Sequence, residues 1–146
     1  MTEQQQEFGI HSIYLKDVSF EAPNSPEVFK TQFQPQIEMN LNIDTKNIDE
    51  DVYEVVLAVT VSAKVDDKSA FLVELQQAGV FTIAGFDEAS LGPMLGVYCP
   101  NVLFPYARES VANLVTKGGF PQLLLEPVNF ESLYAQHLQE QTGSVQ

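Results

Sequence analysis

The chain carries few side chains whose types and spacing could support catalysis. Its two histidines, His11 and His137, are far apart in the sequence, and its acidic run at residues 49–51 precedes a predicted strand, as solvated loops often do. No histidines, cysteines or carboxylates recur at the spacing of metal ligands. Gly118 and Gly119 are followed by Phe and Pro, so the Gly-Lys-Ser/Thr sequence of a phosphate-binding loop is absent. We therefore expect no enzyme, no metal and no cofactor.

The composition is strongly acidic, with 20 Asp and Glu against 7 Lys and Arg among 146 residues, and a formal net charge of −13. At this length, and with 45% hydrophobic residues, we expect one globular domain over residues 1–146. The charge disfavours nucleic acid and anionic membranes as partners and favours basic protein surfaces. The single cysteine, Cys99, excludes an internal disulfide and a cysteine-based zinc site. Residues 1–7 lack the pattern of a secretory signal, so we expect a cytoplasmic location.

Residues 89–107 are all uncharged, over almost the length of a membrane span. One straight helix in lipid could not accommodate all of the glycines and prolines that interrupt this segment. These residues are Gly92, Pro93, Gly96, Pro100 and Pro105. We therefore expect a folded apolar segment with a break in it, and no membrane insertion.

Alternating apolar and polar residues predict strands in the first part of the chain. Most odd positions are apolar in residues 36–43 and 51–65, and the same parity continues through residues 71–83 after a polar turn at 66–69. We expect the last two runs to form an antiparallel hairpin. The side chains predicted to face the core are Ile37, Met39, Leu41, Ile43, Tyr53, Val55, Leu57, Val59, Val61, Val65, Phe71, Val73, Leu75, Phe81 and Ile83.

Residues 8–21 alternate less regularly, and two prolines within residues 22–26 end this run. The apolar even positions are Phe8, Ile10, Tyr14, Val18 and Phe20. The polar odd positions include His11, Asp17, Ser19 and Glu21. We predict a further strand here, with these two sets on opposite faces.

Helical spacing replaces the alternation after the predicted strands. Pro105 suits the first turn of a helix that ends at Lys117 before two glycines, and Asn129 suits the N-cap of a final helix. Residues 139–146 are polar and lack periodicity, so we expect order over about residues 8–138 and a flexible tail beyond. The outline is an α+β domain, a four-stranded antiparallel sheet with two or three helices packed on one face.

A sheet covered by helices on one face has a second face left over. If the first and fourth predicted strands are neighbours, the alternation brings Asp17 and Glu21 beside Leu72 and Glu74 on that face. An ordinary solvated surface would explain the carboxylates. The presence of Leu72 among them favours an interaction surface instead.

The chain also contains ten Phe, five Tyr and three Met, a large aromatic and flexible apolar content for its length. We expect some of these side chains to cover an oligomer interface or to line a groove. Phe29 and Phe33 are the first candidates, because they lie between prolines in residues 23–35. Core packing is the alternative for most of the others.

Five stretches of the sequence are long and specific enough to identify a family. They are LKDVSFEAPN at 15–24, DVYEVVL at 51–57, YCPNVLFPYARE at 98–109, FPQL at 120–123 and PVNF at 127–130. Over about residues 8–138, the chain resembles the SecB family of protein-export chaperones. The resemblance implies an ATP-independent cytoplasmic holdase that binds unfolded precursor proteins and passes them to the SecA translocation ATPase. It also implies a homotetramer, assembled as a dimer of dimers. In the family, the basic, zinc-binding tail of SecA docks on the acidic outer face of the sheet, at positions matched here by Asp17, Glu21, Leu72 and Glu74.

Two further sets of residues follow from this interpretation. We expect a client-binding groove to include Phe33, Met39, Leu41, Tyr134 and Leu138, for each of which core packing is the competing role. We expect subunit contacts through the uncharged segment at 89–107 and the helix at 105–117, including Val111 and Leu114.

Three other functions remain open on the sequence. The first is a general cytoplasmic holdase without an export role, like the SecB-like chaperones of toxin–antitoxin systems, although the acidic outer residues argue against it. The second is a small-ligand-binding domain or an enzyme that works through carboxylates. The third is a structural subunit that uses its apolar surface only for assembly. Delayed refolding of a precursor without nucleotide, together with co-elution of SecA, would separate these functions.

Overall fold

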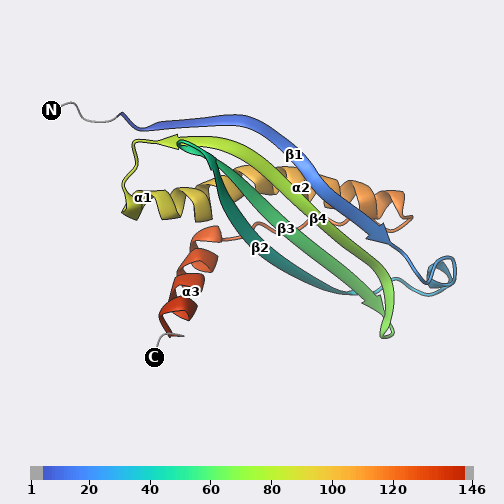
Figure 1. Ribbon diagram of the computed structural model, residues 1–146. Helices are drawn as coiled ribbons and strands as arrows, with labels where there is room; N and C mark the ends of the chain where they lie inside the picture. The colour runs from blue at the N-terminus through green and yellow to red at the C-terminus, as the bar shows by residue number, and fades with distance from the viewer. Residues whose placement is uncertain (1–4, 144–146) are drawn as a thin grey trace.

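The computed structural model describes residues 5–143, which form one antiparallel sheet with helices across one of its faces (Figure 1). The strand order is β1-β4-β3-β2, so the first and fourth strands are neighbours, and β1 and β2 form the edges. The predicted four-stranded α+β architecture is confirmed. The strands are β1 (Glu7–Glu21), β2 (Gln36–Asp49), β3 (Val52–Val65) and β4 (Lys68–Ala84).

The predicted hairpin is formed by β3 and β4, which pair from Val52↔Thr82 to Val65↔Lys68. Its two turn residues, Asp66 and Asp67, both have positive φ, at 51° and 63°. Positive φ at both central residues is typical of the type I′ turn, whose twist matches that of the flanking strands. The predicted inner side chains of this hairpin are buried in the core, among them Leu57, Val59, Val61, Phe71, Val73, Leu75, Phe81 and Ile83.

The edge strand β1 departs from simple alternation, because its pairing with β4 shifts at two bulges. One shift lies between Ile10 and Ser12, and the other between Leu15 and Asp17. Each extra residue reverses the phase of the side chains that follow it. The prediction that Tyr14 shares a face with Phe8 and Phe20 is therefore wrong, since Tyr14 pairs with Ala78 and lies on the opposite face of the sheet.

An almost continuous helical run follows β4 and crosses the inner face of the sheet (Figure 1). It starts at α1 (Glu88–Pro93), where the Asp87 carboxylate accepts a hydrogen bond from the Ser90 N–H at 2.8 Å. A π-helical turn, η2 (Met94–Tyr98), connects α1 to α2 (Cys99–Lys117). No helix within residues 5–143 is long and apolar enough to cross a membrane.

The long helix α2 begins at Cys99 rather than near Pro105, so the predicted start of this helix is wrong. Pro100 lies in the first turn of α2, directly after the π-helical turn, whereas Pro105 removes one backbone hydrogen bond from the interior of the helix. The helix continues through Pro105 because one side of it packs on the core at every fourth residue. The side chains of that stripe, each 0% exposed, are Cys99, Leu103, Ala107, Val111 and Val115.

The last helix, α3 (Phe130–Gly143), is capped as predicted, because the Asn129 side chain accepts a hydrogen bond from the Ser132 N–H at 3.0 Å. Phe130 anchors its start in the core, with its ring centroid 5.9 Å from that of Phe104 in an edge-to-face arrangement. The helix extends beyond the expected end of order at Leu138, and residues 144–146 of the predicted tail lie outside the described part of the chain. The remaining element, η1 (Glu27–Lys30), is a short 3-10 turn between β1 and β2.

Candidate functional site

The outer face of the sheet brings together the four residues that the sequence grouped there. On the paired strands β1 and β4, Asp17 lies opposite Gln76, the adjacent outer pair joins Ser19 to Glu74, and Glu21 lies opposite Leu72. The three carboxylates are exposed, and Leu72 is half-buried. We call Asp17, Glu21, Leu72 and Glu74 the acidic patch. Its side chains point away from the helices, because their neighbours Phe20, Val73 and Leu75 pack on the opposite face.

The carboxylates of the acidic patch are available to a basic partner. Within the described part of the chain, the one side-chain ion pair joins Lys16 to Glu54, outside the patch. Unpaired exposed carboxylates with a half-buried leucine at one end of the patch combine long-range attraction for a cation with a small apolar contact. The patch therefore suits an extended basic segment.

Beside the acidic patch, Glu54 of β3 collects three polar contacts on the same outer face. The Tyr14 hydroxyl donates to its Oε2 at 2.5 Å, and the Lys16 ammonium donates to Oε1 at 2.9 Å and to Oε2 at 3.0 Å. These bonds, first that from Tyr14 and then that from Lys16, hold the pKa of Glu54 below its usual value. Burial, and then the bond to Glu54, raise the pKa of Tyr14 to about 12. At neutral pH the group consists of a neutral phenol, a carboxylate and an ammonium.

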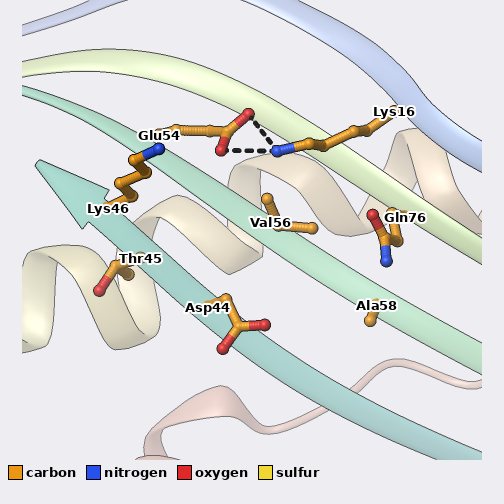
Figure 2. A pocket seen from close by; sticks show the side chains of 8 residues that line it. All are labelled: Lys16, Asp44, Thr45, Lys46, Glu54, Val56, Ala58 and Gln76. Carbon is orange, nitrogen blue, oxygen red and sulfur yellow. Dashed lines mark hydrogen bonds and ion pairs between the residues drawn. The ribbon is translucent and has the colours of Figure 1, made fainter. Parts of the chain in front are cut away.

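A shallow hollow of about 210 Å³ lies next to this group, with a floor of small side chains (Figure 2). Its lining carries two lysines and two carboxylates, so its formal charge is zero. It is lined by Lys16, Asp44, Thr45, Lys46, Glu54, Val56, Ala58 and Gln76. The hollow is half open to solvent and four of its side chains are charged, unlike the enclosing pockets with few polar groups that hold small-molecule ligands.

A second surface, of aromatic side chains, gathers around Phe120 just beyond the end of α2. The ring centroid of Phe120 lies 5.1 Å from that of Phe71, 5.3 Å from that of Phe29 and 5.5 Å from that of Phe33. The series runs from the core to the surface, since Phe71 is 1% exposed and Phe29 is 49% exposed. Gly119, with φ of 91°, leaves room for the Phe29 ring. The sequence singled out Phe29 and Phe33, but it gave no signal for Phe120 other than the glycines before it.

The predicted groove residues do not form one contact site. Phe33 belongs to the Phe120 cluster, whereas Tyr134 packs on Gly92 and Gly96, before the start of α2. The 19 residues of α2 separate these two places by roughly 28 Å at 1.5 Å per residue. Met39 and Leu41 are half-buried on the inner side of the edge strand β2, and Leu138 is 44% exposed on α3. A groove that used all five would have to run the length of the helix.

The two predicted interface residues, Val111 and Leu114, differ in their exposure to solvent. Val111 is 0% exposed within the single chain and belongs to the core, so the expectation that it contacts a second subunit is corrected. It lies on the α2 stripe that faces the sheet, which sequence spacing could not distinguish from an outward stripe. Leu114 is half-buried against the core and keeps some exposed surface. Tyr106, 50% exposed, marks the outward side of α2.

The residues with reactive side chains are dispersed. Burial raises the pKa of the Cys99 thiol to about 12, which leaves it protonated and inert at neutral pH. His11 lies on β1 beside Thr82, whereas His137 lies on α3, far away in the sequence. Within residues 5–143, no three His, Cys, Asp or Glu side chains are grouped so that they could hold a metal ion.

The fold and its two surfaces define an α+β domain with one charged and one aromatic surface, an arrangement suited to binding other polypeptides. Residues 1–141 match the family described as Preprotein translocase subunit SecB. The chain is 57% identical to the protein-export protein SecB of Hydrogenovibrio crunogenus, over 97% of this chain and 95% of that protein. It is 58% identical to the SecB of Nitrosococcus oceani, over 97% of this chain and 87% of that protein. The chain therefore belongs to the SecB family of protein-export chaperones, which are not enzymes.

A solved structure extends the comparison to the fold. The SecB-like chaperone of Mycobacterium tuberculosis, determined in complex with an antitoxin peptide, superposes with a TM-score of 0.69 at 16% identity. The match covers 83% of this chain and 90% of that chain. At this identity the likeness concerns the fold, and it agrees with the antiparallel sheet and helices described above.

Proposed function

We propose that this chain is an ATP-independent holdase of the cytoplasm, which keeps unfolded precursor proteins competent for translocation and delivers them to the SecA ATPase. The observation that carries the proposal is the exposure of the acidic patch on a face that the chain's own helices leave uncovered. Membership of the SecB family supports the same function. Capture and delivery would then use different surfaces of one domain.

Client capture rests on apolar surface. An unfolded client that lays aromatic side chains against Phe29 and Phe33 removes apolar area from water, at about 25 cal/mol per Å². Half-buried Met39 and Leu41 extend this surface along β2, an edge strand whose unpaired backbone groups can bond to an extended client. Tyr134 and Leu138 would contribute at the far end of the same path. A folded client hides the segments that this surface binds.

Delivery rests on charge. Asp17, Glu21 and Glu74 attract the basic tail of SecA, and Leu72 adds an apolar contact at one end of the patch, opposite Glu21. Because exposed charges are screened by salt, we expect the affinity for SecA to fall steeply as ionic strength rises.

Assembly into a homotetramer, as a dimer of dimers, would multiply the client surface. The edge strand β1 supports this proposal, since Ile10, Leu15 and Val18 are 44–49% exposed along it. An edge with unpaired backbone groups and exposed apolar side chains is suited to pairing with a second copy. Tyr106 and Leu114 on α2 are suited to the second contact. Several client surfaces on one oligomer raise the effective concentration for later segments of a bound client.

The test uses the purified full chain without nucleotide. We expect it to delay refolding of a denatured precursor and to co-elute with SecA. Glu74→Lys should abolish co-elution with SecA and leave the delay unchanged, because Glu74 lies on the face opposite the aromatic cluster. An equal loss of client binding would contradict the division into two surfaces. Delayed refolding without SecA binding by the unaltered chain would indicate a general holdase.

A further inference from the structure

The acidic patch depends on a bulge in the edge strand β1. Leu15 pairs with Gln77 and Asp17 with the adjacent Gln76, so β1 uses one extra residue, Lys16, at this point. If β1 had no bulge and Lys16 lay opposite Gln76, regular alternation after the inward-facing Leu15 would turn Asp17 and Glu21 toward the core. The bulge therefore sets the orientation of half of the acidic patch.

Contacts on the outer face hold this bulge in place. The Lys16 ammonium and the Tyr14 hydroxyl both reach the Glu54 carboxylate on β3, two strands away, and they cross β4 to do so (Figure 2 shows the Lys16 contact). The β4 residue opposite Tyr14 is Ala78, a small residue that is 0% exposed. The small side chain of Ala78 lets the side chains of Tyr14 and Lys16 pass over β4.

A contact on the inner face holds the same bulge. Gln77 is 3% exposed, and its Nε2 donates to the backbone carbonyl of Tyr14 at 3.1 Å. A buried amide is costly unless it is hydrogen-bonded, and here the bond goes to the residue just before the bulge. The bulge is thus fixed from both faces of the sheet, by polar groups from β3 and β4.

We propose that Lys16 and Gln77 are positioning residues for the SecA-docking surface, because they hold the β1 bulge that turns Asp17 and Glu21 outward. This inference rests on the proposed docking role of the acidic patch. Neither residue needs to touch the partner. They would affect binding indirectly, by keeping the carboxylates of Asp17 and Glu21 directed outward.

The charge of Lys16 makes the proposal distinguishable from simple electrostatics. Removing this cation makes the outer face more negative, so attraction alone predicts tighter binding of a basic partner. Loss of the bulge predicts weaker binding, because Asp17 and Glu21 are no longer held outward. The two explanations therefore differ in the sign of the effect.

The experiment measures the dissociation constant of purified SecA for the full chain by titration calorimetry at low and moderate salt. We expect Lys16→Met to weaken binding by about fivefold or more, and Lys16→Arg to restore it, since arginine can still donate to Glu54. The matched control is Lys46→Met, which removes the same charge from the same hollow but breaks no hydrogen bond to Glu54 in the described structure. We expect this control to leave binding unchanged or slightly tighter.

Two results would overturn the inference. One is tighter or unchanged SecA binding by Lys16→Met while Glu74→Lys abolishes it. The other is an equal loss of client binding and of thermal stability in Lys16→Met, which would indicate general destabilisation. If Glu74→Lys itself leaves SecA binding intact, the docking role of the patch fails, and that outcome is distinct from failure of the positioning role.

Discussion

The two faces of the sheet use the same strands for different purposes. On the inner face Phe71, Val73 and Phe81 are at most 1% exposed and pack under α2. On the outer face Leu72 and Glu74 alternate with them along the same strand and meet solvent. Neighbouring residues in the chain therefore have different roles. Substitutions on the inner face should change the free energy of unfolding, and those one position away on the outer face should change the binding of SecA.

The largest effect is expected at the core. Phe71→Ala should lower the free energy of unfolding by about 3–5 kcal/mol, because it empties a fully buried site. Leu72→Ala, one residue along on the outer face, should cost less than about 1 kcal/mol. Chemical denaturation of both variants tests the comparison, and similar losses would contradict it.

The outer face should show the reverse pattern. Glu74→Lys should change the free energy of unfolding by no more than about 0.5 kcal/mol, since its side chain is exposed, while weakening SecA binding at least about tenfold. Denaturation and calorimetry on one preparation measure both quantities. The control is Lys64→Glu, the opposite reversal at an exposed position of β3 outside the patch, which should retain SecA binding.

A smaller, pH-dependent effect is expected where the outer face does contribute to stability. The pKa of Tyr14 is raised, so its hydrogen bond to Glu54 stabilises the fold below pH 10 and is lost as the pH rises toward about 12. The pKa of Glu54 is lowered, so its contribution is present above its ordinary value of 4.5 and is lost as the pH falls through the native value. Tyr14→Phe should therefore cost about 1 kcal/mol at neutral pH and much less at either extreme. Denaturation at several pH values tests this, and a cost that is independent of pH would be inconsistent with the hydrogen bond.

The smallest effect on the free energy of unfolding is expected at the turn that joins β3 to β4, at the end of the sheet. Asp67 has a φ of 63°, which glycine adopts without a steric penalty, so Asp67→Gly should stabilise the chain by about 0.5 kcal/mol. The control Asp67→Val should destabilise it, because a β-branched residue fits that conformation poorly. Thermal unfolding of the two variants should give shifts of opposite sign.

The two edge strands show how far the sequence predicts this fold. In β2 the apolar residues Met39, Leu41 and Ile43 alternate strictly, and the predicted inner face is the observed one. In β1 the bulges reverse the phase twice, and the alternation misplaced Tyr14. A bulge depends on contacts such as those of Gln77 and Glu54, which come from distant parts of the chain. Local periodicity does not contain that information.

The predicted sites show the same limit. The positions of Asp17 and Glu21 on the outer face followed from parity, because both lie after the second bulge and keep one phase. Val111 and Tyr134 were less predictable, since helical spacing identifies a stripe but not the element against which it packs. The start of α2 was missed because proline rules describe an isolated helix, whereas burial of five consecutive stripe residues offsets the bond lost at Pro105.

The packing of Tyr134 on Gly92 and Gly96 limits which residues can replace these glycines in the family. A methyl group at Gly92 would overlap the Tyr134 hydroxyl, while the next ring atom, Cζ, lies 3.5 Å away at an ordinary contact distance. Alanine at position 92 is therefore compatible with phenylalanine, but not with tyrosine, at position 134. A methyl group at Gly96 would instead come within 2.5 Å of the ring carbon Cδ1, which excludes either aromatic residue. The two glycines should therefore vary differently among relatives: replacement of Gly92 requires loss of the Tyr134 hydroxyl oxygen, whereas replacement of Gly96 requires loss of the whole aromatic ring.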